Sequence, residues 1–370
     1  MSKPRLRVRP GRPEDEPVIG QLLDRLLDDP RPLDVRRRLW RWRSDENPAR
    51  SDRIPGFLVA EKGDAIVAVH GLLPLRMRVA GRELVVSSSC DLAADPRARS
   101  AGMRIKLAAM SPDLAPMHLS TSANESANKI TLALEGLEMP IGRGKWIKPL
   151  RASGLLVRAL RARGGAWRAL AGLVGWAALP VDGLLALGRR WTSVPDLPGL
   201  QIEEGAAFDA RFDRLWARLV DRCAVSVVRD AAYLEWRYAR YPFAGIEWLA
   251  VSGDGEVEGF AAWHTSVDED GLCFAALLDC EAPEGRVLER LLVEVIRRAG
   301  RAGAHYVVAR TADDRLRQAM ERRGFRLREG GHSQVTYKAA DELPEDLLAD
   351  AGSWSLSLGD GDGCFFYEGR

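Results

Sequence analysis

One stretch of the sequence combines residue types that bind phosphate groups. Residues 91–104 read DLAADPRARSAGMR, with Ser100, Ala101 and Gly102 in the middle of the stretch. The first turn of a helix leaves backbone N–H groups unpaired, and the helix dipole is positive at that end. Glycine permits close backbone approach, and Arg99 can add charge-assisted hydrogen bonds. The stretch is therefore a candidate pyrophosphate-binding loop, although a purely structural turn has a similar composition.

Group transfer at such a loop also requires a base. Asp91 closes the strand before the loop, Glu61 adjoins a hairpin turn, and His70 lies on an apolar strand. Each has a structural alternative, because an Asp at a strand end caps loops, a Glu beside a turn is solvated, and a His on an apolar strand is a core residue. Asp91 and His70 remain the candidate catalytic residues.

The elements that position these residues follow from hydrophobic periodicity. The order predicted for the first half is β-α-α-β-β-β-α-β-α, in which FLVAEKGDAIVAVHGLL reads as a hairpin with a Gly-Asp turn. The expected strands are 5–9, the two arms of the hairpin over 57–73, 84–92 and 118–122, and the expected helices include 18–27, 102–110 and 125–135.

The second half repeats this order. Its expected helices are 208–221, 231–240, 287–299 and 315–323, and its expected strands are 248–251, 257–264, 272–278 and 305–310. Trp42 and Trp236 differ by 194 positions, whereas Asp91 and Asp279 differ by 188. Gly136 and Gly324 also differ by 188, so the landmarks remain collinear with one small deletion. A period this long indicates two copies of one domain.

The motif Trp-Arg-x4-Pro marks the same place in each copy. It begins at Trp42 and at Trp236, between the second helix and the first hairpin. A Trp there can fill space over the sheet while its Arg reaches a carboxyl group. The functional alternative is recognition of an acceptor, since aromatic rings stack on sugar faces.

With this order and loop, the chain resembles the GNAT acyltransferase family, whose acetyl-CoA signature is Gln/Arg-x-x-Gly-x-Gly/Ala. Arg99-Ser100-Ala101-Gly102-Met103-Arg104, preceded by Pro96, fits except that Arg104 replaces Gly or Ala. Asn124 fits the family Asn that contacts the pantetheine arm. Thr131 stands where a general-acid Tyr is frequent, and all six tyrosines lie at position 233 or later.

The resemblance implies an N-acetyltransferase that uses acetyl-CoA and acts on a small amine or aminosugar. It implies cofactor contacts from Arg99, Ser100, Ala101, Gly102, Met103, Arg104 and Asn124. It also implies a β-bulge within 86–92 that turns an amide towards the thioester. The tail WSLSLGDGD resembles the ending of tandem GNAT proteins often associated with surface-polysaccharide gene clusters.

The second copy is expected to be degenerate. Glu281 and Glu284 stand where phosphates would bind, and carboxylates repel a pyrophosphate. We expect this copy to complete the acceptor groove or to stabilise the first.

The segment between the copies, residues 151–191, is apolar and interrupted by arginines. It is too interrupted for a spanning helix. It is compatible either with a helical linker packed across the seam of the two domains or with an amphipathic helix at a membrane surface, through residues 155–188. The expected domains are 1–150 and 199–370, with the linker at 151–198.

Composition narrows the classes of partner, site and location that remain. The net charge of +2 gives no strong field for nucleic acid, so no nucleic-acid partner is expected. Five cysteines without CxxC spacing favour reduced buried thiols over a disulfide framework or a metal site. The N-terminus lacks the apolar region of a secretory signal, which favours a cytoplasmic protein or one peripheral to the inner membrane.

The sequence thus predicts an α/β fold of two GNAT-like mixed-sheet domains in tandem, joined by a helical apolar linker. Two functional alternatives remain open. One is a catalytically inactive CoA-binding or scaffold protein, favoured by Arg104 and the missing Tyr. The other is a Fem-like aminoacyl transferase at the membrane surface, favoured by the apolar linker.

Overall fold

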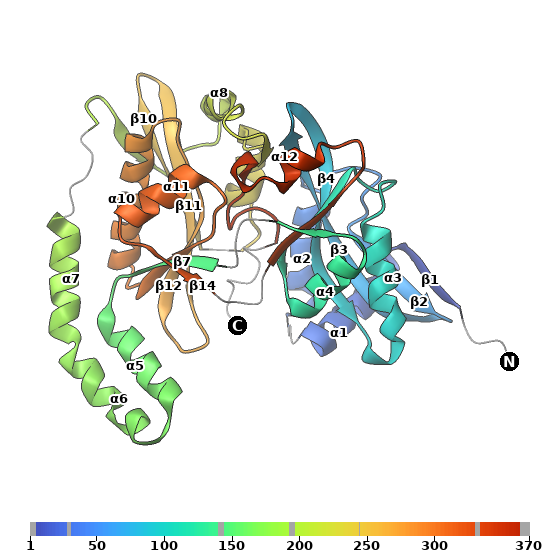
Figure 1. The fold of residues 1–370 in the computed structure, drawn as a ribbon, viewed down its shortest axis with the longest axis horizontal. Coiled ribbons are helices and arrows are strands. Elements are labelled where there is room, and N and C mark those ends of the chain that lie inside the picture. Colours follow the sequence, from blue (N-terminus) through green and yellow to red (C-terminus); the bar gives the residue numbers. More distant parts are fainter. Residues whose placement is uncertain are drawn as a thin grey trace.

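The computed structural model describes residues 5–27, 31–139, 144–191, 197–243, 245–329 and 334–362. Two mixed β-sheets stand beside each other, each covered by helices, and a group of three helices lies on the outer side of the second sheet (Figure 1). The prediction of an α/β chain with two mixed sheets is confirmed.

The first sheet consists mainly of strands from the first half of the chain. In spatial order its strands are β1 (Leu6–Pro10), β2 (Phe57–Lys62), β3 (Ala65–Val79), β4 (Arg82–Ala94), β5 (Met117–Ala123), β15 (Gln334–Ala339) and β6 (Leu137–Glu138). Two short strands from the second half, β9 (Val225–Val227) and β16 (Trp354–Ser355), extend it beside β3.

Helices cover both faces of this sheet because side chains of a strand alternate between faces. Val59 of β2 packs with Ile19, whereas its neighbour Leu58 packs with Ile105. The first face carries α1 (Glu16–Leu27) and α2 (Leu33–Ser44), and the second carries α3 (Arg99–Ala109) with α4 (Glu125–Ala133) after it.

The second sheet has the matching arrangement. In spatial order its strands are β14 (Arg326–Glu329), β7 (Gly144–Pro149), β13 (Tyr306–Ala309), β12 (Cys273–Glu281), β11 (Glu256–Val267), β10 (Ile246–Gly253) and β8 (Gln201–Glu204). Ala250 packs with Phe212 of α8 (Ala210–Leu219), and its neighbour Leu249 packs with Leu291 of α10 (Gly285–Arg301). The remaining helices of this half are α9 (Ala231–Leu234), a π-helical turn (Glu235–Ala239), α11 (Asp314–Arg322) and α12 (Glu345–Ala349).

The two sheets exchange one strand each. β7 follows the first copy in the chain, yet it lies between β13 and β14, with Trp146 opposite both Ala309 and Leu327. β15 follows the second copy, yet it lies between β5 and β6, with Tyr337 opposite Leu119. Boundaries drawn at residues 150 and 199 therefore follow the order of the chain, whereas each sheet is completed by a strand from the other side of the linker.

The Trp-Arg motifs of the two copies meet at the seam between the sheets. The Trp42 and Trp236 rings stack, with centroids 4.6 Å apart and planes 15° from parallel. Each indole Nε1 donates a 2.8 Å hydrogen bond to the backbone carbonyl of the other tryptophan. Both rings are buried, so the alternative of stacking on a sugar acceptor is wrong for this pair. The reciprocal contacts show that the copies are related by an approximate twofold axis at the seam.

The segment between the copies forms three helices, α5 (Ala152–Arg163), α6 (Gly165–Ala177) and α7 (Leu179–Trp191). We call these residues, 152–191, the helical arm. They lie on the side of the second sheet that faces away from the first sheet, so the expectation of a linker packed across the seam is wrong (Figure 1). Within the described ranges, no helix has the length and apolar character needed to cross a bilayer.

Candidate functional site

The candidate phosphate loop connects β4 to α3. Pro96–Ala98 form one 3-10 turn, which is held by Asp95: its side chain accepts from the Arg97 N–H at 2.9 Å, and its carbonyl accepts from the Ala98 N–H at 2.8 Å. In the described part of the chain, no side-chain hydrogen bond caps the start of α3. In this region no side-chain cap therefore competes with an anion for the first-turn N–H groups of α3.

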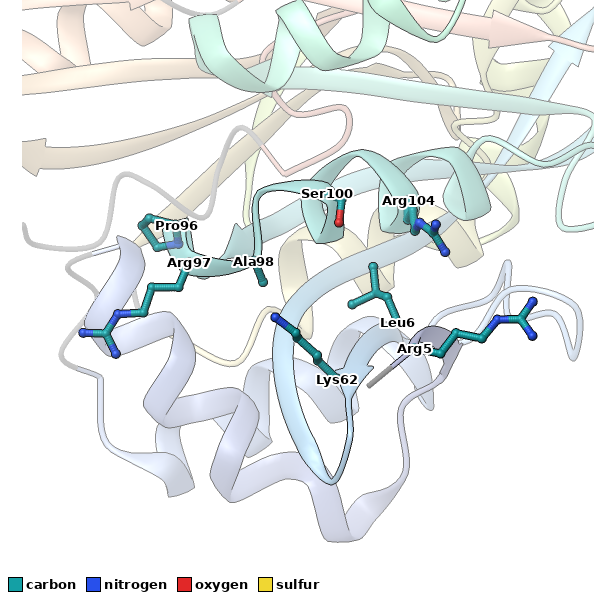
Figure 2. A pocket seen from close by; sticks show the side chains of 8 residues that line it. All are labelled: Arg5, Leu6, Lys62, Pro96, Arg97, Ala98, Ser100 and Arg104. Carbon is teal, nitrogen blue, oxygen red and sulfur yellow. The ribbon is translucent and has the colours of Figure 1, made fainter. Parts of the chain in front are cut away.

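A cavity of about 780 Å³ lies beside this helix start, between α3, β1 and the turn that joins β2 to β3 (Figure 2). Ser100 and Arg104, one turn apart on α3, project towards Leu6 and Lys62. The lining residues in the described structure are Arg5, Leu6, Lys62, Pro96, Arg97, Ala98, Ser100 and Arg104. Every charged residue among them is cationic, so the cavity suits a ligand with several negative charges.

The predicted cofactor residues do not all face this cavity. Ser100 and Arg104 line it, whereas Ala101 is buried and Met103 is exposed without lining it. A Cβ on Gly102 would contact Ala94 at 3.4 Å, so this glycine permits close packing of α3 on the end of β4. The side chain of Arg99 lies outside the described structure.

Two further positions of the expected cofactor site serve helix α4. Asn124 is the N-cap of α4, and its Oδ1 accepts from the Ala127 N–H at 2.9 Å. Thr131 is buried, and its hydroxyl donates to the Ala127 carbonyl at 3.0 Å. Both side chains thus make bonds within the helix, and Thr131 does not offer its hydroxyl to a cleft.

The bulge expected within 86–92 is confirmed. Val69 pairs with Ala93 and Gly71 with Cys90, so His70 alone stands opposite two residues of β4. Asp91, the first of these two, has φ of +49°, which is uncommon for a residue other than glycine. This bulge lies near the end of β4, shortly before the phosphate loop.

The strands β4 and β5 diverge next to this bulge. Their parallel pairing is limited to Ser87 with His118 and Ser88 with Leu119, after which each strand continues without the other. The pairing of β4 with β5 thus stops towards the same end of β4 as the cationic cavity.

Asp91 is held by a buried arginine of the Trp-Arg motif. Arg43 Nη1 donates to Asp91 Oδ2 at 2.7 Å and to Cys90 Sγ at 3.0 Å, and the guanidinium is fully buried. A Cβ on Gly71 would lie 3.0 Å from Arg43 Nη2, so glycine leaves room for this side chain. Asp91 therefore fixes the bulge through Arg43. The third candidate base, Glu61, pairs with Arg9 at the edge of the sheet.

His70 belongs to a buried polar cluster of five side chains beneath α3: His70, Ser87, Ser89, Lys106 and His118. Ser89 Oγ lies 2.8 Å from His70 Nε2, 3.0 Å from His118 Nε2 and 2.6 Å from Lys106 Nζ. His118 Nδ1 lies 2.7 Å from Ser87 Oγ. The sequence pointed to His70 alone, whereas the structure places it in a buried network in which Ser89 contacts both imidazoles and Lys106.

Burial sets the charges of this cluster. It lowers the pKa of Lys106 to about 7, because the ammonium loses its hydration. Burial and then the Lys106 charge lower the pKa values of His70 and His118 well below the usual imidazole value. At neutral pH both imidazoles are uncharged, and Lys106 is the group of the cluster that titrates.

The C-terminal segment brings another carboxylate to this region. Asp362 is buried, and its Oδ1 accepts from Thr121 Oγ1 of β5 at 3.2 Å. Burial is the largest influence on the pKa values of Lys106, Cys90 and Arg43, and the charge of Asp362 makes a smaller, upward contribution to each. Asp362 therefore lies beside β5, near the buried polar cluster, a position that no local sequence pattern indicated.

Comparison with solved structures identifies this architecture. The chain aligns with a GCN5-related N-acetyltransferase from Anabaena variabilis over 90% of its length and 73% of that chain, with a TM-score of 0.56 and 11% identity. The chain also aligns with a GCN5-related N-acetyltransferase from Kribbella flavida, over 91% of its length and 71% of that chain, with a TM-score of 0.56 and 14% identity. Saccharomyces cerevisiae N-myristoyltransferase, solved with bound myristoyl-CoA and inhibitors, aligns over 95% of this chain and 85% of its own, with a TM-score of 0.54 and 12% identity. The chain has a tandem GNAT fold. No protein-family model matches it, and no curated protein does.

The cleft of the second GNAT copy is filled by the chain's own tail. Gly359 N–H donates to the Leu278 carbonyl at 2.7 Å, at the bulge of β12. A Cβ on Gly359 would lie 2.6 Å from the Tyr238 hydroxyl and 2.9 Å from the Leu278 carbonyl, so any larger residue would clash at this position. The tail thus lies against the bulge of the second sheet.

Buried charges lock the tail in this second cleft. Arg229 binds Asp279 at 2.8 Å and Asp360 of the tail at 2.7 Å. Burial raises the pKa of Glu281 to about 8, and Glu284 is the residue before α10. Glu281 is therefore part of the buried charge network, while Glu284 stands at the helix start that corresponds to the phosphate site.

Strand exchange also brings a tyrosine into the first sheet. β15 places Tyr337 in the first sheet, although the first half of the sequence has no tyrosine. Tyr337 is paired with Leu119, packs against Trp354 and lies on the opposite face from His118 and Ser120. Its phenol therefore faces the seam and not the buried polar cluster. In the described residues, no group of three His, Cys, Asp or Glu side chains is arranged to hold a metal ion.

Proposed function

We propose that this chain is an N-acyltransferase whose first GNAT copy binds an acyl-CoA, and that the acyl group is acetyl. The observation that carries the proposal is the difference between the copies. The first combines an uncapped helix start and a cationic cavity with a pairing of β4 and β5 that is limited to two residue pairs. In the second, the tail binds at the bulge of β12 through Gly359, and the acidic Glu284 stands at the corresponding helix start. The shared fold with acetyltransferases, and with a myristoyltransferase that holds myristoyl-CoA, supports the same assignment.

Donor binding follows from the cavity. Ser100 and Arg104 would hold phosphate groups from α3, with Lys62 opposite them. Arg104, which departs from the family signature, would then contribute a charge-assisted contact. The bound donor supplies a thioester carbonyl that is already activated for attack by an amine.

Proton transfer is assigned to the carboxylate of the tail. The attacking amine must lose a proton, and an acceptor within hydrogen-bond reach accelerates that step. Asp362 is a buried carboxylate of the tail that contacts Thr121 of β5, whereas Asp91 binds Arg43 at the bulge. We therefore assign the base to Asp362, with Asp91 fixing the bulge. The acceptor would be a small amine or aminosugar, in a groove completed by the second copy.

Calorimetry tests the donor site. Acetyl-CoA should bind the wild-type chain, and Lys62→Glu with Arg104→Glu should weaken binding at least tenfold, because two cationic contacts become repulsive. Arg301→Glu, an exposed change at the end of α10, is the matched control and should bind as the wild type does. Equal affinities in the double variant and the control would remove the phosphate assignment. Myristoyl-CoA, tested in parallel, reports the acyl preference.

Release of free CoA thiol across a panel of amines and aminosugars tests turnover. The N-acyltransferase proposal expects release that depends on both acetyl-CoA and an amine. Acetyl-CoA binding without release from any acceptor would instead support the non-catalytic CoA-binding alternative.

A further inference from the structure

The helical arm exposes an unusual amount of apolar surface. Of the seventeen large apolar side chains that are exposed in the described structure, ten belong to the arm. They are Leu156, Trp167, Leu170, Leu173, Trp176, Leu179, Val181, Leu184, Leu185 and Leu187. Contiguous exposed apolar surface on this scale marks an interaction site.

Helix α6 has the opposite burial pattern to a surface helix of a soluble domain, because its small side chains are buried and its large apolar side chains are exposed. Its small residue Ala171 and the following Ala178 are buried, and a Cβ on Gly175 would lie 2.7 Å from Val157 of α5. Its large residues face outwards, with Leu173 69% and Trp176 77% exposed. Small residues thus bring α5 and α6 close together, while the large apolar side chains remain for an external partner.

The arm carries positive charge beside this apolar surface. Residues 152–191 contain six arginines and a single acidic residue, Asp182. That carboxylate accepts hydrogen bonds from the Ala152 N–H and from Ser153, so it is used at the start of α5. Arg163 lies over the Trp167 ring, 5.9 Å from its centroid. Tryptophan and arginine side by side suit the headgroup region of a bilayer.

The arm is fixed to the body at one end. A Cβ on Gly154 would lie 2.3 Å from His305, so α5 begins in close contact with the second sheet. Arg158 binds Asp268 at 3.0 Å. Helices α6 and α7 pack on α5 and on each other, and in Figure 1 they form the outer edge of the molecule. The outward face is therefore held at the surface and is not covered by the body.

We propose that the outward face of the helical arm binds an anionic lipid bilayer, with its helices lying in the plane of the headgroups. We favour this occupant over a second copy of the chain because the arm has an excess of positive charge, so two arms would repel each other. An anionic surface is complementary to the arginines, and the acyl boundary accepts Leu173 and Trp176.

Co-sedimentation of the full chain with vesicles tests this proposal. Vesicles of phosphatidylcholine with phosphatidylglycerol should bind the chain at least tenfold more strongly than phosphatidylcholine alone, and raising the salt should weaken binding. Leu173→Asp with Trp176→Asp should reduce binding tenfold or more. Val18→Asp, an exposed apolar position on α1, should leave it unchanged.

Three outcomes would overturn the proposal: no sedimentation with anionic vesicles, equal binding by the double variant and the wild type, or equal binding to neutral and anionic vesicles. Light scattering identifies the competing occupant. A wild-type dimer that the double variant converts to a monomer, together with no vesicle binding, would assign the arm to self-association. Circular dichroism of both variants confirms that each is folded, since the changes lie on exposed positions.

Discussion

Lys106 Nζ lies 2.6 Å from Ser89 Oγ, with the lysine side chain fully buried between α3 and the first sheet. The same helix carries Ser100 and Arg104 on the face that lines the cationic cavity. One helix therefore presents charge to an anion on one side and places an amine in the core on the other. Burial lowers the pKa of this amine to about 7, so its charge state changes near neutral pH.

The lysine should give the stability of the protein a recognisable pH dependence. Between about pH 7 and the usual lysine pKa, the unfolded chain binds a proton at this position and the folded chain does not. Stability should therefore rise with pH across this window, by about 1.4 kcal/mol per pH unit as an upper limit. Lys106→Met removes the titration. Denaturant unfolding at pH 6 to 9 should show the wild type gaining stability relative to this variant as the pH rises.

Lys129→Met is the matched control, because Lys129 is exposed on α4 and pairs with Glu125. Its stability difference from the wild type should not vary with pH over the same range. A constant difference for Lys106→Met as well would show that Lys106 keeps its charge in the folded state.

The sequence predicted the order of elements well because periodicity is a local property. The hairpin at 57–73 and the helix after Gly102 lie within a few residues of their observed positions. The matched positions of Trp42 and Trp236 indicated duplication, and in the structure these residues contact each other. Local pattern was sufficient wherever neighbours in the chain are also neighbours in space.

No pattern in the sequence predicted the strand exchange. The segments of β7 and β15, GKWIKP and QVTYKA, are each compatible with either sheet, since the two copies share one architecture. The contact between Thr121 and Asp362 joins residues 241 positions apart, which no periodicity encodes. The buried polar cluster left a weak trace: Ser87 and Ser89 are polar positions in an expected strand, and Lys106 interrupts the apolar stripe of α3.

The tryptophan pair should contribute strongly to stability because it is buried and reciprocally hydrogen-bonded. Trp42→Phe keeps much of the stacking but removes one indole N–H, which leaves the Trp236 carbonyl without its partner. We expect a loss of about 1–3 kcal/mol. Trp236→Phe should cost a similar amount, and a double-mutant cycle should give a coupling energy of about 0.5–3 kcal/mol.

Denaturant unfolding measures these values, with Trp167→Phe on the exposed face of α6 as the control. That variant should unfold at the wild-type midpoint. Strict additivity of the Trp42 and Trp236 changes would contradict the reciprocal contact at the seam.

Strand exchange predicts that neither half folds alone. Residues 1–150 would retain β7 without its sheet and would leave β5 and β6 without β15 between them. This fragment should be insoluble or unfolded by circular dichroism. In contrast, co-expression of 1–195 with 196–370 should yield a stable complex, because the cut falls in the connection after α7 and each fragment carries the strand that the other sheet needs.

Size-exclusion chromatography distinguishes the two designs. Co-expression of 1–143 with 144–370 provides a control in which β7 joins its own sheet but the cut still separates the halves. A cooperative thermal transition in isolated 1–150 would show that the first sheet is complete without β15.

Asp362→Asn tests the assignment of the catalytic base. The change preserves size and the capacity to accept a hydrogen bond from Thr121, but it removes the proton-accepting carboxylate. If Asp362 accepts the amine proton, kcat should fall by about 10²–10⁴-fold, while the affinity for acetyl-CoA measured by calorimetry stays within a factor of two or three.

Asp91→Asn is the comparison variant: it weakens the bond to Arg43 and should lower stability more than kcat. His70→Gln should reduce kcat less than Asp362→Asn, because the imidazole is fully buried and its Nε2 contacts Ser89. Near-wild-type turnover in Asp362→Asn with a large loss in Asp91→Asn would return the catalytic role to the strand bulge, and the tail would then be a structural closure of the cleft.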